Sequence, residues 1–412
     1  MASSRLFTFI VVLAIYALLE LYIFSGIRHT FKNPTGQKVL LGVYVFSVLM
    51  FVIGIITLFT SFSNGYSQVT WLPNLIIGLN VTFLFTKLFF ALLLLVIDLE
   101  SLVSFIISKF SETPLPSPQR RKILKQLGVF VAAIPFSAYL YGVLKGRYDY
   151  RIHRVTLRFP DLPTAFDGYR IAQISDVHSG SFDNYGAVKA GIDKIQQQNP
   201  DLILFTGDMI NNLAEEIEPY ISLFAALKAP QGKYAVLGNH DYGEYVSWES
   251  AAAKDQNLER LKGHHQQMGF QLLNNAQVSL QKGEDAIKLV GVENWGKKPF
   301  PQKGDLKKAF AESKPNDFSI LMSHDPSHWD MQVLDFPQKV HLTLSGHTHG
   351  MQMGVEIPGF RWSPVKYRYP RWAGLYQKAE QYLYVNRGFG YIGFPGRVGI
   401  WPEITIIELK KA

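Results

Sequence analysis

The sequence predicts a membrane region of four helices followed by one α/β domain. Two observations lead to this fold class. Of the 412 residues, 48% are hydrophobic, and the long apolar runs are concentrated in the first third of the chain. The remainder alternates short apolar β-type runs with amphipathic helical stretches, which is the pattern of a mixed, largely parallel sheet system covered by helices. Its length suits one domain with a large core better than two.

Four apolar segments are long enough to cross a bilayer, which requires about 20 residues. The fourth is shorter and contains Pro135, so its hydropathy also allows a buried helix, but its flanks favour a span. We expect a transmembrane region over residues 1–147, with the second domain over residues 148–412. The predicted spans are Leu6–Ile27, Val39–Phe62, Leu72–Leu99 and Leu127–Leu144.

Two features within the membrane region have local consequences. Glu20 and Lys87 lie inside apolar runs, where an ionisable group is costly, so we expect them either to pair or to extend toward the interface. Glu100–Phe110 is predicted to form a short interfacial helix, and the proline-rich Thr113–Pro118 a stiff linker.

Lysine and arginine are distributed unevenly between the connecting loops. The first loop carries Arg28, Lys32 and Lys38, the third carries five such residues, and the second, Ser63–Trp71, carries none. Cytoplasmic loops are enriched in these residues, so the domain after Leu144 is expected on the extracytoplasmic side of an inner or plasma membrane. The basic stretch Lys145–Arg154 favours the opposite side, but such charges need not prevent translocation of a large domain.

A second feature agrees with an exported domain. Arg120, Arg121, Leu124 and Lys125 precede an apolar run and resemble a twin-arginine export signal. The alternative interpretation is an ordinary positive-inside cluster.

Composition restricts the chemistry. The chain has no cysteine, which excludes disulfides, zinc–thiolate sites and cysteine nucleophiles, so histidine, asparagine and carboxylates must supply any metal ligands. The net charge is +8, but much of it lies beside the apolar runs, where it sets topology. No nucleic-acid partner is expected, and the apolar segments imply a lipid bilayer as a partner.

The second domain alternates predicted strands and helices. Helices are expected over Tyr185–Gln198, Ala214–Leu227 and Ala253–Met268, and short strands over Gln271–Val292. The other predicted strands are Arg154–Phe159, Tyr169–Ser175, Leu202–Thr206, Lys233–Leu237, Phe318–Ser323, Val340–Ser345, Tyr382–Asn386 and Glu403–Leu409.

A polar cluster lies directly after each of five of these strands. Because the carboxyl ends of strands in α/β sheets gather at one edge, the clusters should converge in space. In Asp176-x-His178 and His347-x-His349, an i, i+2 spacing in extended chain would direct both side chains to the same side. The clusters are Asp176-Val177-His178, Gly207-Asp208, Gly238-Asn239-His240-Asp241, His324 and Gly346-His347-Thr348-His349.

Oxygen and imidazole donors suit manganese, iron, zinc or similar divalent ions. Two such ions about 3.5–4 Å apart need one bridging carboxylate and a set of donors each. A single Asp-x-His or Gly-Asp pair is uninformative because turns after strands favour these residues. Five in series indicate a metal site.

This ordered series resembles the calcineurin-like metallophosphoesterase family, and the resemblance covers nearly all of Arg154–Leu409. It is most similar to the membrane-linked branch, with phosphodiesterases of the YaeI and YkuE kind, transmembrane proteins with a metallophosphoesterase domain and UDP-2,3-diacylglucosamine pyrophosphatases. Asn386-Arg387-Gly388 and Pro402-Glu403-Ile404 are also similar to that branch. The resemblance implies an α/β (α+β) fold of two packed mixed β-sheets flanked by helices.

The resemblance also implies roles for named residues. Asp208 would bridge two divalent metal ions, and a hydroxide between the ions would attack phosphorus. The first metal would be held by Asp176, His178 and His349, and the second by Asn239, His324 and His347.

Three neighbouring residues complete the expected site. His240 would face the phosphate and either protonate the leaving group or stabilise charge. Many members have an aspartate that polarises this histidine where the present chain has Asn211, which can still orient the ring. Asp241 can take part in the same orientation.

The leading hypothesis is a hydrolase that cleaves a phosphoester or pyrophosphate bond in a lipid-linked or cell-envelope substrate. Besides the bilayer, the resemblance therefore implies a phosphorylated small-molecule or lipid substrate as a partner. One alternative is a UDP-2,3-diacylglucosamine pyrophosphatase of lipid A synthesis with a cytoplasmic-facing domain. Another is a non-catalytic membrane sensor or scaffold that retains the fold, whose signature would be lost ligands. The aromatic and basic segment Gly359–Tyr376 is either a contact with phospholipid headgroups or a core loop with solvated charges.

Overall fold

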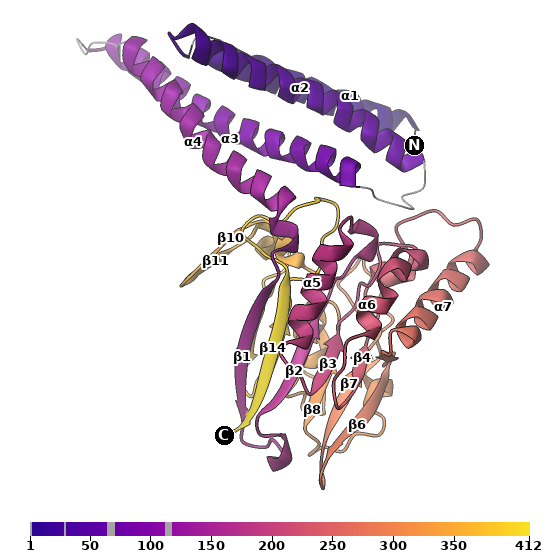
Figure 1. Cartoon of the computed structure of the whole chain (residues 1–412). Helices are drawn as coiled ribbons and strands as arrows, with labels where there is room; N and C mark the ends of the chain where they lie inside the picture. The colour runs from indigo at the N-terminus through magenta and orange to yellow at the C-terminus, as the bar shows by residue number, and fades with distance from the viewer. Residues whose placement is uncertain (1, 29, 64–70, 112–117) are drawn as a thin grey trace. The chain divides into compact units, whose positions relative to one another are not determined.

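The computed structural model describes residues 2–28, 30–63, 71–111 and 118–412 (Figure 1). The chain divides into two compact units, one formed by Met1–Asn64 with Leu75–Tyr141 and the other by Gly65–Asn74 with Gly142–Ala412. Except for Pro118, the predicted linker lies outside the described residues, and so does most of the predicted loop 63–71.

Four long helices form the N-terminal part of the chain. All four are long and apolar enough to cross a membrane, with mean hydropathies from 1.9 to 2.8. Each predicted span lies within one of them, and the last helix continues through Pro135. Their bounds are α1 (Ala2–Ile27), α2 (Pro34–Ser63), α3 (Trp71–Ser108) and α4 (Pro118–Leu144).

The separate interfacial helix predicted over Glu100–Phe110 is wrong. Helix α3 continues without a break from the predicted span to Ser108. The physical reason is that no glycine or proline interrupts the sequence between Leu99 and Ser108, so nothing ends the helix at the membrane interface.

The predicted pairing of Glu20 and Lys87 is confirmed. The Lys87 ammonium contacts the Glu20 carboxylate, and both side chains are buried between helices. The Tyr16 hydroxyl lies 3.3 Å from Lys87 Nζ. Two charges that are costly in an apolar bundle therefore neutralise each other.

The second unit contains two six-stranded mixed sheets. The first has the order β1-β14-β2-β3-β4-β5 and is parallel except between β14 and β2. The strands of this sheet are β1 (Arg151–Phe159), β14 (Glu403–Lys411), β2 (Tyr169–Ile174), β3 (Leu202–Phe205), β4 (Lys233–Ala235) and β5 (Gln271–Leu272).

The second sheet has the order β12-β13-β9-β8-β7-β6, with antiparallel pairs at its two edges and parallel pairs between. A separate hairpin, β10 (Val355–Ile357) with β11 (Phe360–Trp362), belongs to neither sheet. The strands of the second sheet are β6 (Ala276–Lys282), β7 (Asp285–Gly291), β8 (Ser319–Met322), β9 (Leu342–Ser345), β12 (Gly374–Lys378) and β13 (Gln381–Val385).

Alternation along the strands divides the core into layers. In β3, Ile203 packs toward the helices that cover the first sheet, whereas Leu202 and Leu204 pack into the layer shared by the two sheets. The covering helices are α5 (Tyr185–Gln196), α6 (Ile221–Ala225) and α7 (Ala251–Gln267), which lie on one face of the first sheet in Figure 1. The predicted two packed mixed sheets flanked by helices are thereby confirmed.

The helix predicted over Ala214–Leu227 is only partly correct. Residues Ala214–Tyr220 form a 3-10 helix, and the α-helical turns of α6 follow it. Pro219 is the physical reason, because it lacks the N–H that a continuous α-helix would use at that position. The chain also forms a short helix, α8 (Leu306–Ala309), that the apolar pattern does not predict.

His265 on α7 makes the fold sensitive to acid. It is fully buried and packs against the rings of Phe205 and Phe270. Neither ring nitrogen has a hydrogen-bond partner within the described part of the chain. Burial, together with neighbouring His264, lowers the pKa of His265 from 6.5 to about 3.

We predict that His265→Leu reduces the acid sensitivity of folding. Below pH 6.5 the unfolded chain binds a proton at this position, whereas the native chain binds it only at about pH 3. As the pH is lowered through this window, the free energy of unfolding therefore decreases by up to ~1.4 kcal/mol per pH unit for one proton. Urea unfolding of the detergent-solubilised chain at several pH values measures the slope. Equal slopes for both proteins between about pH 6 and about pH 4 would contradict the prediction.

Candidate metal centre

The five predicted clusters meet where the two sheets end. Parallel strands β2, β3 and β4 end at the clusters of Asp176, Asp208 and Asn239, and β8 and β9 end at His324 and His347. The Asp176 carboxylate accepts a hydrogen bond from the His347 N–H at 2.9 Å, which joins a loop of the first sheet to a loop of the second. The convergence predicted from the strand ends is therefore observed.

The first group of ligand atoms comprises Asp176, His178 and His349, whose donor atoms all lie within 4.8 Å of one another. His349 Nε2 is 3.2 Å from Asp176 Oδ1. His178 Nδ1 lies 3.1 Å from the side-chain oxygen of Asn211, which leaves Nε2 directed into the group. All three side chains are buried.

The second group comprises Asp208, His324 and His347 within the same limit. His324 Nδ1 donates to the carbonyl of Thr206 at 2.7 Å, so its Nε2 faces the group and lies 3.1 Å from Asp208 Oδ2. His347 Nδ1 is 3.3 Å from His324 Nε2. Asn239 joins this group, because its Oδ1 is 2.8 Å from His347 Nδ1.

Asp208 stands between the groups. Its Oδ2 is 3.6 Å from His178 Nε2 in the first and 3.1 Å from His324 Nε2 in the second. A carboxylate in this position can contribute to two adjacent cation sites at once.

The donor set fits divalent cations. The Nε2 atom of His178 is buried and has no hydrogen-bond partner among the described residues, and that of His349 has only the Asp176 carboxylate within 3.2 Å. An unsatisfied buried ring nitrogen is unfavourable, and coordination to a cation would satisfy it. The second nitrogens of His178 and His324 are fixed by oxygen acceptors, as is usual for histidines that bind metals.

Electrostatics of the centre also favour a bound cation. Burial alone would raise the pKa of Asp208, but His324, His240 and His178 hold it well below its ordinary value. Burial lowers the pKa of His324, yet Asp208 beside it raises the value to about 10. In the protein alone, the buried carboxylate is therefore neutralised by histidine protons, which cations would replace.

The ligand loops have an unusual backbone. Asp176, His178, Asp208, His347 and His349 all have φ between +47° and +70°. Positive φ is uncommon for residues other than glycine and typically costs about 1–3 kcal/mol each. The two i, i+2 pairs therefore do not chelate from extended chain, as the sequence suggested; left-handed turns direct their side chains into the centre instead.

Glycines beside the candidate ligands permit close approach. A Cβ on Gly238 would lie 2.2 Å from Asp208 Oδ1, and one on Gly346 would lie 2.2 Å from Asp176 Oδ2. Both distances are far inside van der Waals contact, so only glycine fits these positions.

Asp241 lies beneath the ligands rather than among them. It is fully buried, and its carboxylate accepts backbone hydrogen bonds from Asp208 at 2.9 Å, Met209 at 2.8 Å and Gly238 at 2.8 Å. These bonds join the loops after β3 and β4. We interpret Asp241 as a residue that positions Asp208 and the segment carrying Asn239 and His240.

Asn211 contacts two histidines in a way that differs from the expectation. The sequence suggested that its side chain orients His240, but that side chain contacts His178. The His240 ring is held instead by the backbone carbonyl of Asn211, 2.8 Å from Nδ1. The reason is geometric: the Asn211 amide donates to the Ser181 hydroxyl at 3.1 Å, which turns its oxygen toward His178.

Tyr369 and Asp325 extend the second group. The Tyr369 hydroxyl lies 2.8 Å from His347 Nε2 and 3.4 Å from Asp325 Oδ2. Tyr369 lies within the aromatic segment Gly359–Tyr376, but only the fold brings it to His347. Asp325 also accepts the Ser327 N–H at 2.8 Å, so this carboxylate serves both as a turn cap and as a neighbour of the centre.

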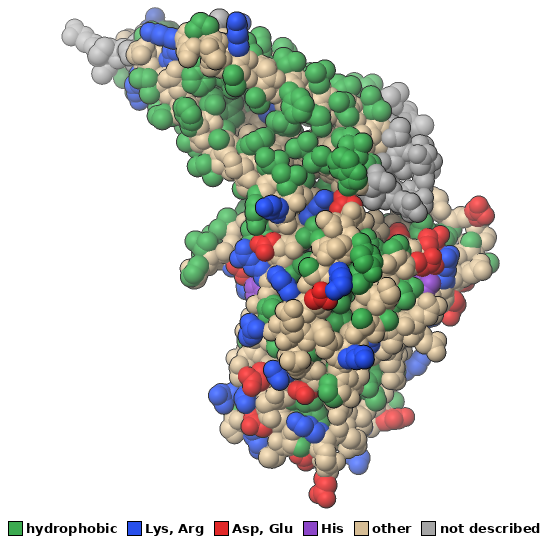
Figure 2. Space-filling model, viewed as in Figure 1, with side chains coloured by type: hydrophobic (Ala, Val, Ile, Leu, Met, Phe, Trp, Pro, Cys, Tyr) green, Lys and Arg blue, Asp and Glu red, His purple; other side chains and the backbone are tan. Residues whose placement is uncertain are grey.

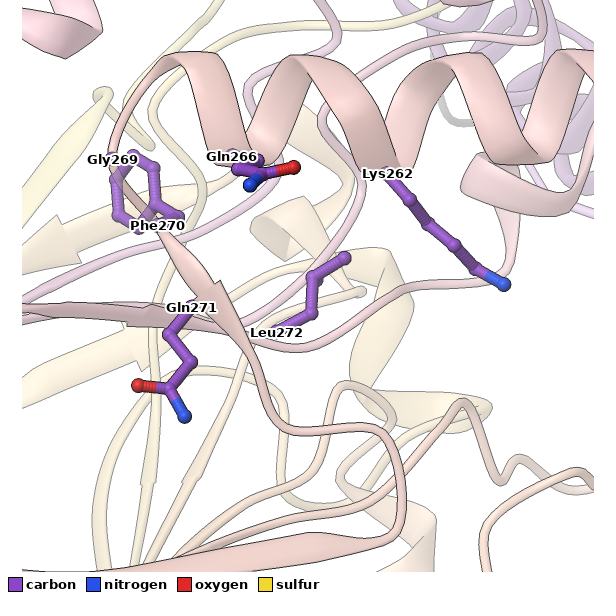
Figure 3. Close-up of a pocket in the computed structure, with 6 residues that line it drawn as sticks. All are labelled: Lys262, Gln266, Gly269, Phe270, Gln271 and Leu272. Atoms are coloured by element: carbon purple, nitrogen blue, oxygen red, sulfur yellow. The ribbon is translucent and has the colours of Figure 1, made fainter.

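A separate hollow of about 450 Å³ lies at the end of α7 (Figure 3). None of the candidate ligands lines it, and its only charged side chain, Lys262, is paired with Glu259 at 2.7 Å. We assign it no chemistry.

We predict that Tyr369→Phe weakens metal binding about tenfold, because outer partners of metal-binding histidines typically have effects of this size. The hydroxyl that fixes the His347 ring is lost, while the packing of the ring is kept. Competition between the metal-free chain and a chelating dye for added Mn²⁺ measures the affinity. Tyr367→Phe is the matched control, since Tyr367 is on the same segment but 78% exposed. Equal affinities for both variants would overturn the assignment.

Comparison with known proteins agrees with the geometry. The calcineurin-like phosphoesterase model matches residues 169–351, and a model described as a probable calcineurin-like phosphoesterase transmembrane domain matches residues 4–147. The chain is 31% identical over 300 residues to the uncharacterized metallophosphoesterase YkuE of Bacillus subtilis, covering 71% of this chain and 98% of that protein.

Two further relatives are similar to this chain in sequence. A transmembrane protein with metallophosphoesterase domain from Danio rerio is 28% identical, covering 66% of this chain and 60% of that protein's length. The UDP-2,3-diacylglucosamine pyrophosphatase LpxG of Chlamydia muridarum is 30% identical, covering 58% of this chain and 83% of that protein. The chain is therefore an integral membrane protein that belongs to the calcineurin-like metallophosphoesterases, hydrolases acting on phosphoester bonds.

Proposed function

We propose that the chain hydrolyses a phosphodiester or pyrophosphate bond using two divalent metal ions. Asp176, His178 and His349 would hold one ion, and Asn239, His324 and His347 the other, with Asp208 shared. The single observation that carries this proposal is the Asp208 carboxylate, which lies 3.6 Å and 3.1 Å from histidines of the two groups. When bound, the ions would supply an ionised water at neutral pH and neutralise charge on the phosphoryl oxygens.

His240 would handle the proton or charge at the leaving group. Its Nδ1 is held by the Asn211 carbonyl at 2.8 Å, so Nε2 is the atom left to face a substrate. The His240 ring packs against His178 with ring centres 4.9 Å apart, which places it beside the first group. Tyr245 covers its other side at 4.4 Å and accepts a hydrogen bond from the Asn239 amide at 2.8 Å. A proton on Nε2 would pass to the leaving oxygen.

We further propose a lipid-linked or cell-envelope substrate. The four apolar helices keep the catalytic domain at a bilayer, where such substrates are found. The similarity to LpxG favours a specific second candidate, UDP-2,3-diacylglucosamine, whose cleavage would require a cytoplasmic-facing domain. A non-catalytic sensor is not supported, because all seven candidate ligands are retained and brought together.

We predict that Asp208→Ala abolishes hydrolysis of bis(p-nitrophenyl) phosphate in the presence of added Mn²⁺, because both metal groups lose their shared ligand. Steady-state release of nitrophenolate by the purified chain measures the rate. Asp193→Ala is the matched control, since this carboxylate is half exposed and paired only with Lys189 on the same helix. Equal rates for wild type and Asp208→Ala would remove the catalytic proposal.

His240→Gln separates metal binding from proton transfer. It should retain the metal content of the wild type but lower kcat by ~10²-fold, the smaller end of the range for a lost general acid. Metal analysis on the same preparation verifies that the centre is loaded. A fall in metal content with the rate would instead assign His240 to the ligand set.

We predict that the catalytic domain is extracytoplasmic, because the lysine- and arginine-rich loops are the first and third. Protease added to spheroplasts should then digest residues after Leu144, detected with a C-terminal epitope tag. A known cytoplasmic protein serves as the integrity control. A protected domain would reverse the topology and favour the UDP-2,3-diacylglucosamine hypothesis.

A further inference from the structure

The β10–β11 hairpin projects away from the two sheets in Figure 1. Its strands are joined by Pro358 and Gly359, and the register pairs Val355 with Trp362, Glu356 with Arg361 and Ile357 with Phe360. Cross-strand partners share a face of a hairpin, and successive residues alternate between faces. One face therefore carries Val355, Ile357, Phe360 and Trp362, and the other carries Glu356 and Arg361.

In this hairpin the charged face contacts the domain and the apolar face is exposed, which is the reverse of the usual arrangement. Glu356 forms an ion pair with buried Arg387 at 2.6 Å, and the Arg361 guanidinium lies over the rings of Trp372 and Tyr376. The charged face thus contacts the domain through these two side chains, although both residues remain partly exposed. The apolar face is left open, with Ile357 58% and Phe360 54% exposed. Figure 2 shows hydrophobic side chains covering this projection.

The β6–β7 hairpin of the same domain provides a contrast. Its tip is Lys282-Gly283-Glu284, and all three residues are exposed. This is the composition expected of a hairpin that ends in water. The apolar tip of β10–β11 therefore differs from a tip that ends in water, and an exposed apolar patch of this kind marks an interaction surface.

The base of the β10–β11 hairpin is tied to the end of the last apolar helix. Gly142 lies in the final turn of α4 and belongs to the same compact unit as the hairpin. Its carbonyl accepts the Arg397 N–H at 3.2 Å. The next residue, Val398, accepts the Gly354 N–H at 2.9 Å, and Gly354 directly precedes β10. The hairpin thus starts beside the point where the chain leaves its last predicted span.

We propose that the β10–β11 hairpin inserts its apolar face into the surface of the lipid bilayer. The occupant is a bilayer rather than a protein because four apolar helices already hold the chain in one, and Arg397 and Val398 join the hairpin base to Gly142, in the final turn of the last of these helices. Lys366 and Arg368, which follow the hairpin, are exposed and complement anionic headgroups.

Insertion would bring lipid close to the metal centre. His349 of the first ligand group lies six residues before Val355, and the carbonyl of Gly350 accepts a hydrogen bond from the Ser363 hydroxyl at 2.7 Å, which closes the base of the hairpin. On the far side of the segment, Tyr369 contacts His347 of the second group at 2.8 Å. The hairpin is therefore connected at both ends to candidate ligands, so a substrate embedded in the same leaflet would be held near the centre.

The absence of cysteine allows a direct test. Phe360→Cys and, separately, Ile357→Cys are introduced into the full chain, labelled with a polarity-sensitive fluorophore and reconstituted into phosphatidylethanolamine–phosphatidylglycerol nanodiscs. Nitroxide-labelled phospholipid in the disc then serves as a quencher. Glu284→Cys at the tip of the β6–β7 hairpin is the matched control, and circular dichroism verifies that each variant is folded.

We expect a blue-shifted emission and loss of emission to the lipid quencher at positions 357 and 360, with neither change at 284. A blue shift without quenching would show that a protein partner or a second copy covers the hairpin, and would overturn the proposal. Unshifted, unquenched emission at both positions would also overturn it. Because no readout depends on catalysis, these results are independent of the nitrophenyl phosphate assay.

Discussion

The structure depends on one carboxylate shared by two clusters of histidine. Asp208 lies within reach of His178 on one side and His324 on the other, and its own backbone is held by the buried carboxylate of Asp241. Removing a carboxylate from water is costly unless charges or hydrogen bonds compensate it. In this centre the compensating groups come from both sheets. The geometry of the centre therefore depends on how the two sheets pack.

The fold stores strain where the ligands lie. Five ligands occupy left-handed backbone conformations that their side chains disfavour. Such conformations persist only where surrounding structure fixes them. Here the Asp241 carboxylate holds the Asp208 backbone, and Gly238 and Gly346 leave room for the Asp208 and Asp176 carboxylates. Burial of the large apolar layers on both sides of the first sheet offsets the free-energy cost of these conformations.

The two functional surfaces of the catalytic domain belong to one continuous stretch of chain. From His347 to Tyr369 the polypeptide passes through two candidate ligands, projects as an apolar hairpin and returns to place a phenol on the first of those ligands. The proposed membrane-directed surface and the candidate metal centre are thereby joined by one short segment of chain. This arrangement suits an enzyme whose substrate has both a phosphate and an apolar part.

The sequence by itself determined the order of elements, the four apolar helices and which residue types converge, because hydrophobic periodicity and strand-end clusters are local signals. The ordered motifs also resemble a family in which the residue at the position of Asp208 bridges two metal ions, which made Asp208 the candidate for that role. Only the tertiary structure decided which atom of Asn211 holds which histidine, that Asp241 lies beneath the ligands and that Tyr369 reaches His347. It also decided which face of the β10–β11 hairpin remains open. These outcomes arise from contacts between segments distant in sequence and from backbone turns with positive φ, which no periodic pattern encodes.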